Sequence, residues 1–258
     1  MHRVRFRAAL LALSVMATPA TALAADITVL SAGALEAGLP ALAERFSKAN
    51  NHTIRVEIAT PPAIRQRLLA GERADVVIVP PAVLEDKAIA PRLDQATARV
   101  IGRAGVGIAV HVDAPAPRID SADAVKAALL AADSVVYNTA STGTYFVKLI
   151  DRLGIADAVK AKATIYASGQ QVMAHVAKGT KDRSALGIGP LTEIHLYVGK
   201  GVRLVGPLPA DIQNHTSYVA VVMAGGTAPA VAADFIAFLA SAPSLAAFAA
   251  TGLEPASR

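Results

Sequence analysis

The sequence predicts an α/β protein built on mostly parallel sheets. Short β-branched runs alternate with amphipathic helices through most of the 258 residues. One run, Val76-Val77-Ile78-Val79, is continuously apolar, which is typical of a strand that helices cover on both faces. Strand–helix alternation at this density indicates a parallel sheet. Because the chain has no cysteine, its core must hold without disulfides.

The first part of the chain predicts three strands separated by two helices. Apolar residues recur at helical spacing from Leu35 to Ala49, and Ile54 to Ile58 alternates as a half-buried strand does. Proline at 61 and 62 is tolerated in the first turn of the next helix, which Gly71 closes. The expected elements are a strand at 27–30, a helix at 35–49, a strand at 54–58, a helix around 64–69 and a strand at 76–79.

Strands and helices continue to alternate through most of the rest of the chain. The expected elements are a strand at 105–110, a helix at 122–131, strands and helices alternating at 134–137, 143–153, 164–166, 170–178 and 185–188, strands at 202–205 and 218–223, and helices at 229–241 and 243–250. No Pro/Ser-rich linker separates the first set of elements from the second. This favours two lobes joined by strands that cross between them.

The N-terminus predicts export. Arg3, Arg5 and Arg7 precede an uncharged apolar run, and Ala22-Leu23-Ala24 supplies the small residues of a cleavage site. A membrane anchor is the alternative, but a spanning helix needs about 20 apolar residues and Pro19 interrupts this run earlier. We therefore expect residues 1–24 to be a signal peptide and the mature chain to be periplasmic.

Composition and motifs exclude several function classes. The three leader arginines carry three of the five excess positive charges, and no basic run follows, so nucleic acid is not an expected partner. The chain has no G-x-S-x-G, H-E-x-x-H, Walker A or G-x-G-x-x-G pattern, and its histidines lack metal-site spacing. We expect no catalysis, no cofactor and no metal.

Four small polar or glycine-containing loops each connect the end of a predicted strand to the start of a predicted helix. Each places free backbone N–H groups at a helix N-terminus, which attracts anions. In open α/β sheets such loops lie at the carboxyl ends of the strands, where ligands bind. One such loop is ordinary capping, but four predict a cleft for an anionic ligand. The loops are residues 31–34, 59–62, 138–143 and 167–170.

Four segments resemble the periplasmic molybdate-binding proteins of ABC importers, which are type II periplasmic solute-binding proteins. Their order and spacing cover nearly the whole mature chain. They are the strand and turn Ile27–Leu35, the helix and strand from Ala63 to Ile78 with Ala74-Asp75-Val76, the strand Ala185–Gly189, and the terminal segment Phe235–Pro255.

The resemblance implies a two-lobed periplasmic binding protein fold with a two-strand hinge. Lobe one would comprise residues 25–107 and 219–258, and lobe two residues 108–218. The protein would act as a monomer that captures a small anionic solute between its lobes and delivers it to the membrane permease of an ABC importer. The lobes would close over the ligand by a hinge motion.

The resemblance also places the site, which departs from the family's pattern. Ala34 and Thr60 stand where the family has serines, and Pro190 stands where it has a tyrosine hydroxyl. Pro61 and Pro62 remove two backbone donors. These losses favour a small organic acid over molybdate, although either oxyanion or organic acid is allowed. The expected ligand-binding residues are Ser31, Gly33, Ala34, Thr60, Arg65, Ser141, Thr142, Gly143, Gly169, Gln170 and Pro190.

Arg65 is the one cation in this set. It either clamps a ligand carboxylate with both arms of its guanidinium or is a solvated helix residue. Two other functions stay open on the sequence alone. One is a secreted α/β hydrolase, although the loops show no nucleophile–base pair. The other is a solute-binding module that serves a sensor rather than an importer.

Overall fold

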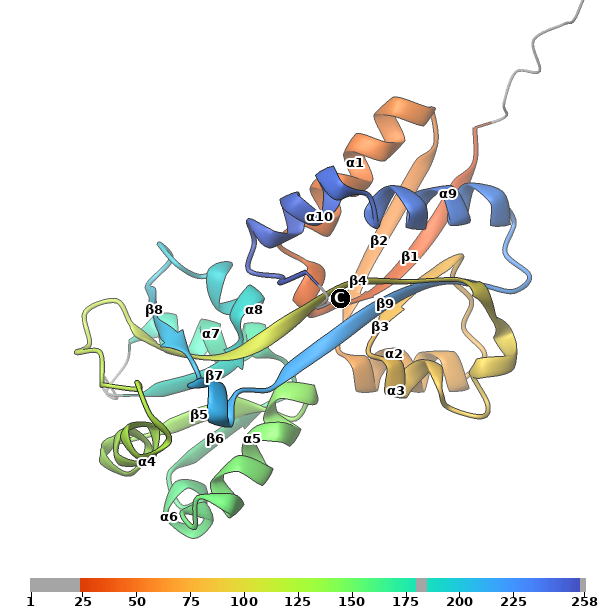
Figure 1. The fold of residues 1–258 in the computed structure, drawn as a ribbon. Helices are drawn as coiled ribbons and strands as arrows, with labels where there is room; N and C mark the ends of the chain where they lie inside the picture. The colour runs from red at the N-terminus through yellow and green to blue at the C-terminus, as the bar shows by residue number, and fades with distance from the viewer. Residues whose placement is uncertain (1–23, 180–184, 256–258) are drawn as a thin grey trace, which may run out of the picture.

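The computed structural model describes residues 24–179 and 185–255. The predicted signal peptide, residues 1–24, lies outside the described residues except for Ala24. The described strands run in the order β2-β1-β3-β9-β4-β7-β5-β6, with β8 paired to β4. Figure 1 shows that they form two groups, each flanked by helices and joined by two long strands.

Lobe one is our name for the group built on three parallel strands, β2 (Thr53–Ala59), β1 (Asp26–Ala32) and β3 (Val76–Val79). The antiparallel strand β9 (His215–Met223) extends this sheet beside β3. One face packs against α1 (Leu39–Asn50), α9 (Pro229–Leu239) and α10 (Ala242–Ala249). The other face packs against α2 (Pro61–Leu69) and α3 (Pro81–Leu84). Short 3-10 turns lie at η1 (Gly33–Leu35) and η2 (Ala90–Arg92).

Lobe two repeats this plan around the parallel strands β6 (Ala163–Tyr166), β5 (Val135–Asn138) and β7 (Leu186–Pro190). β4 lies antiparallel to β7, and β8 (Val202–Pro207) pairs with β4. One face is covered by α4 (Ala122–Ala131), α5 (Ser141–Arg152) and α6 (Ala156–Lys160). The other face is covered by α7 (Gly169–Lys178) and α8 (Leu191–His195). A 3-10 turn, η3 (Ala210–Ile212), precedes β9.

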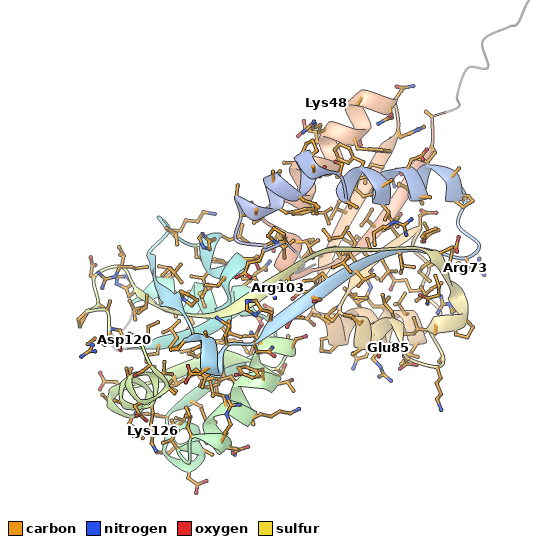
Figure 2. The ribbon with its side chains drawn as sticks, viewed as in Figure 1. Lys48, Arg73, Glu85, Arg103, Asp120 and Lys126 are labelled. Carbon is orange, nitrogen blue, oxygen red and sulfur yellow. The ribbon has the colours of Figure 1, made fainter. Side chains whose placement is uncertain are left out.

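Two antiparallel strands connect the lobes. β4 (Leu93–His111) pairs with β9 in lobe one and then with β7 and β8 in lobe two. The C-terminal segment is fastened at this crossing, because the backbones of Arg103 and Glu254 exchange two hydrogen bonds of 2.8 Å. Figure 2 shows Arg103 between the lobes, whereas Lys48, Glu85 and Lys126 lie at the periphery. The crossing strands therefore tie both lobes and the chain end together.

The structure confirms the α/β class and the parallel centre of each sheet, and it corrects several boundaries. The strand expected at 105–110 is part of the 19-residue β4, because a strand that passes between lobes has no single alternating face. The first long helix begins at Leu39 rather than Leu35, with Pro40 in its first turn. Helices α3, α6 and α8 have four or five residues and were too short for their periodicity to predict.

None of the helices within residues 24–179 and 185–255 is by itself long and apolar enough to span a membrane. The two C-terminal helices, α9 and α10, meet that test only when taken as a pair bent by 60°.

Aromatic packing anchors lobe one. Phe235 of α9 is fully buried, and its ring meets that of Phe46 edge-on with 5.1 Å between centroids. We expect Phe235→Ala to lower the free energy of unfolding by about 3–5 kcal/mol, because it removes buried contacts and leaves a cavity. Phe238→Ala is the matched control on the same helix, where the ring is only partly buried. Equal losses for the two variants in urea unfolding would contradict this account of the core.

Candidate functional site

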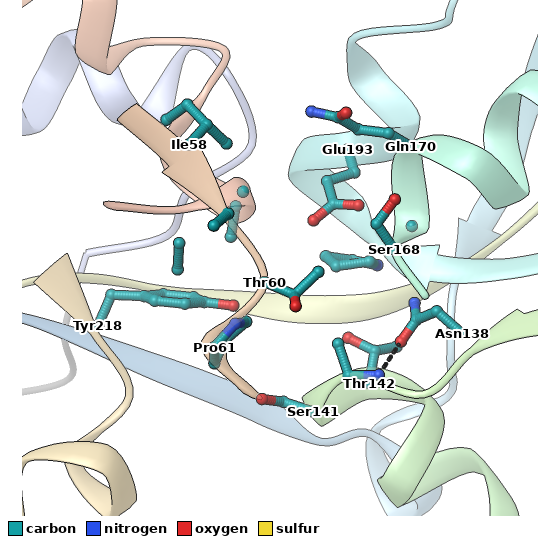
Figure 3. A pocket seen from close by; sticks show the side chains of 17 residues that line it. Ile58, Thr60, Pro61, Asn138, Ser141, Thr142, Ser168, Gln170, Glu193 and Tyr218 are labelled. Carbon is teal, nitrogen blue, oxygen red and sulfur yellow. Dashed lines mark hydrogen bonds between the residues drawn. The ribbon is translucent and has the colours of Figure 1, made fainter. Parts of the chain in front are cut away.

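A cavity of about 190 Å³ lies between the lobes. It opens where the central strands β1, β2 and β5 end, which is the position where open α/β sheets bind ligands. Figure 3 shows side chains of both lobes facing each other across it. Its lining is Ala32, Gly33, Ala34, Ile58, Ala59, Thr60, Pro61, Asn138, Ala140, Ser141, Thr142, Ser168, Gly169, Gln170, Pro190, Glu193 and Tyr218.

Lobe two supplies backbone N–H donors to this cavity. Asn138 Oδ1 accepts from the N–H groups of Ala140 (2.9 Å) and Gly143 (3.3 Å) and so fixes the start of α5. The N–H groups of Ser141 and Thr142, in the first turn, have no acceptor among the described residues. Gly143 must lack a side chain, since a Cβ there would lie 1.4 Å from the carbonyl oxygen of Asn138.

The start of α7 adds a second donor group. Ser168 and Gln171 form a capping box that satisfies the N–H groups of both residues. The N–H of Gly169, the first residue of the helix, has no acceptor within the part of the chain that the structure describes. Two helix N-termini of lobe two, α5 and α7, therefore present unpaired donors and positive dipole ends to one cavity.

Lobe one contributes a mostly apolar wall. Ile58, Ala59 and Ala34 line it, and Thr60 caps α2 by accepting the N–H of Ala63 at 3.4 Å. Pro61 begins the helix and has no N–H to offer. Tyr218 of β9 also lines the cavity, and burial raises the pKa of its hydroxyl, which therefore stays neutral. This wall suits a carbon skeleton rather than a bare oxyanion.

Among the described residues, Glu193 is the one acidic side chain that lines the cavity. It lies on α8, is only 8% exposed, and has no hydrogen-bond partner at Oε2. A Cβ on Gly169 would lie 2.0 Å from Oε2, and a Cβ on Gly33 would lie 3.0 Å from Oε1. The carboxyl is thus held between a glycine of each lobe. Figure 3 shows it pointing into the space between the two walls.

The surroundings of Glu193 favour its neutral form. Burial is the main cause, the charge of Glu36 is the second, and together they raise the pKa of Glu193 to about 7. The N–H of Gln170 acts in the opposite direction, since it stabilises the carboxylate. Burial also raises the pKa of Glu36, and the ammonium of Lys200 partly offsets that rise. A carboxyl that titrates near neutrality can hold or transfer a proton at physiological pH.

Most of the residues predicted from the sequence meet at this cavity, and three do not. Ser31 is buried below it, where its hydroxyl donates to the carbonyl of Ala32. Gly143 packs against Asn138 rather than lining the space. Arg65 lies outside, on the exposed side of α2, where its guanidinium pairs with Asp86 at 2.6 Å. The structure brings together Gly33, Ala34, Thr60, Ser141, Thr142, Gly169, Gln170 and Pro190.

Sequence reasoning missed Ile58, Tyr218 and, above all, Glu193. The signal for Glu193 was present but weak, because it is a single glutamate in the short segment Leu191–His195, just after β7 ends at Pro190. No group of three metal-ligating side chains occurs within residues 24–179 and 185–255. The arrangement can bind a small anion by its donors and hold a proton at Glu193.

Comparisons with known proteins agree with this geometry. Residues 27–254 match the bacterial extracellular solute-binding protein family. The chain is 31% identical over 236 residues to an aconitate isomerase of a Pseudomonas species, covering 89% of this chain and 87% of that protein.

Two solved structures are similar in fold. The sulfate-binding protein of Mycobacterium tuberculosis H37Rv has a TM-score of 0.73 at 17% identity, covering 90% of this chain and 87% of that one. The periplasmic molybdate-binding protein of Azotobacter vinelandii has a TM-score of 0.68 at 16% identity, covering 88% and 98%.

The pKa of Glu193 makes a prediction about stability. Because its folded-state pKa is raised from 4.5 to about 7, its contribution to stability is complete below pH 4.5 and is lost as pH rises through 7. We expect that loss to be on the order of 3 kcal/mol. Glu193→Gln should abolish it, and Glu85→Gln, at an exposed site, should not. The measurement is the free energy of unfolding in urea at pH 4.5 and 7.5, and parallel profiles for wild type and Glu193→Gln would refute the assignment.

Proposed function

The chain belongs to the bacterial extracellular solute-binding proteins, and from this premise we propose that it captures a small polycarboxylate anion between its lobes for an ABC importer. The resemblance to periplasmic molybdate-binding proteins is confirmed, as is the two-lobed fold. The family is typically periplasmic or extracellular, which agrees with the expected export. The proposed partners are the solute and the permease of the importer.

The observation that carries this proposal is the set of unpaired backbone N–H donors at the starts of α5 and α7. Ser141, Thr142 and Gly169 offer N–H groups to the same enclosed space, where a carboxylate can accept them. Among the described residues no Lys or Arg lines the cavity, so these helix ends supply the attraction for an anion. This site resembles the anion sites that the solute-binding fold places between two lobes.

The apolar wall of lobe one favours an organic acid. A molybdate or sulfate ion needs donors on every side, since each of its buried oxygens left unmatched is costly. Here Ile58, Ala34 and Pro61 offer none from their side chains. A polycarboxylate instead places its carboxylates on the donors and its carbon skeleton on this wall. The name of the Pseudomonas relative, aconitate isomerase, points to the same chemical class.

The donor at Ser141 provides a direct test of binding. Ser141 is the first residue of α5, where proline fits the backbone but has no N–H. We expect wild type to bind trans-aconitate in calorimetry, and Ser141→Pro to bind it about tenfold to hundredfold more weakly, because a charge-assisted hydrogen bond is lost. Ser141→Ala, which removes only the hydroxyl, is the control.

Sulfate, molybdate, citrate and cis-aconitate complete the panel of ligands. Tight binding of molybdate with no response to any carboxylate would contradict the proposed ligand class. Equal affinities for Ser141→Pro and wild type would contradict the role of α5.

A second function, isomerisation of aconitate, is favoured by Glu193. Aconitate carries a methylene group between a carboxylate and a carbon–carbon double bond. A carboxylate base can remove a proton from this carbon, and the electron pair of the C–H bond then spreads over the allylic system. The same proton, returned from Glu193 to the far carbon of that system, shifts the double bond and regenerates the base. Atoms and charge balance without a cofactor.

Turnover distinguishes the two functions. If the chain is an isomerase, cis-aconitate should convert to trans-aconitate in a proton NMR assay. Glu193→Gln should lose this conversion and still bind the ligand, because the amide keeps the shape but cannot take up the proton. Binding without conversion by wild type would leave the receptor as the function. Full turnover by Glu193→Gln would exclude it as the base.

A further inference from the structure

The position of Glu193 gives the cavity a property that a simple anion site does not need. We propose that the cavity captures its anion together with one proton, which the carboxyl of Glu193 holds. This inference rests on the proposed function, because it takes a small anion as the ligand. It adds a proton as a second ligand of the same site and so makes capture depend on pH.

The carboxyl of Glu193 lies next to the place where the proposed anion binds. Gly33 of lobe one and Gly169 of lobe two leave room for it only because they lack side chains, as the Cβ distances of 3.0 and 2.0 Å show. Glu193 is 8% exposed, and its Oε2 has no partner among the described residues. The unpaired N–H of Gly169 belongs to the residue that touches Oε2. An anion that accepts this N–H therefore lies beside the carboxyl.

Two negative groups side by side at a largely buried carboxyl repel strongly, since little water screens them. A proton on Glu193 changes the repulsion into a hydrogen bond from its O–H to the anion. A cationic side chain would serve the same purpose, but no Lys or Arg within residues 24–179 and 185–255 lines the cavity. The proton is thus the one positive charge that the described site can add when the anion enters.

The groups that face Glu193 provide no positive charge to keep its carboxyl ionised. Glu36, which follows η1 in lobe one, adds negative charge across the lobe boundary. Tyr197, just beyond α8, and Tyr218 of β9 stay neutral, since burial raises the pKa of both hydroxyls. Lys200 acts on Glu36 rather than on Glu193. Only the N–H of Gln170 favours the carboxylate, and the pKa of Glu193 near 7 agrees with this balance.

The receptor and the isomerase need opposite protonation states at Glu193. A receptor that captures an anion with a proton loses affinity as pH rises above about 7, by about tenfold per pH unit for one linked proton. An isomerase needs the ionised base in its complex, so its turnover would rise over the same range. The direction of the pH dependence therefore reports which role the carboxyl has.

Calorimetry of the mature protein with trans-aconitate at pH 8 tests the proposal. At this pH the ligand is fully ionised, so any proton taken up must come to the protein. Titrations in two buffers with different ionisation enthalpies give the number of protons, and we expect a value near one. Glu193→Gln should take up none, and its affinity should no longer change between pH 6 and 8. Glu85→Gln should behave as wild type does.

A second variant keeps the test informative if Glu193→Gln does not fold. Glu36→Gln removes the negative neighbour and lowers the pKa of Glu193, so affinity should begin to fall at a lower pH than in wild type. Binding by wild type at pH 8 with no proton uptake would overturn the inference and leave the proposed function standing. Absence of binding at both pH 6 and pH 8 would overturn the proposed function itself, and the inference with it.

Discussion

The site depends on one buried carboxyl group that no Lys or Arg of the described cavity lining balances. Glu193 lies on a five-residue helix of lobe two, and its side chain fills the space that Gly33 and Gly169 leave open. Burying a charge there is costly, so the group titrates near neutrality instead of staying ionised. Its position also requires the two lobes to approach closely.

The proposed capture of an anion rests on peptide dipoles rather than on side-chain charge. The unpaired backbone donors come from α5 and α7 of lobe two, whereas lobe one contributes Ile58, the hydroxyls of Thr60 and Tyr218, and an otherwise apolar surface. This asymmetry fits a ligand with a polar end and a carbon skeleton. Solved proteins of similar fold are named for sulfate and molybdate, and the Pseudomonas relative is named for aconitate. Proteins similar to this chain in fold or sequence are therefore named for ligands of different shape.

The sequence predicted the order of most strands and helices because their periodicity is local. It also predicted the loops that form the cavity, since N-terminal capping residues mark them. It did not predict the first twelve residues of β4, which follow a path between lobes, nor α8, which is too short for helical periodicity. Glu193 was missed because it lies on this short helix, and because the glycines that adjoin its carboxyl, Gly33 and Gly169, are distant in sequence. The sequence could not decide the role of Arg65, because no local pattern separates a ligand clamp from a surface ion pair. In the structure, Arg65 is a helix residue that pairs with Asp86.

The central claim is that a polycarboxylate lies between the donors of lobe two and the wall of lobe one. A crystal structure of the mature protein with trans-aconitate tests it most directly. We expect one carboxylate within hydrogen-bond distance of the N–H groups of Ser141, Thr142 and Gly169, another oxygen beside Glu193, and the carbon skeleton against Ile58. A ligand held outside this cavity, for example by Arg65, would contradict the account. So would a ligand in the cavity that contacts none of these groups.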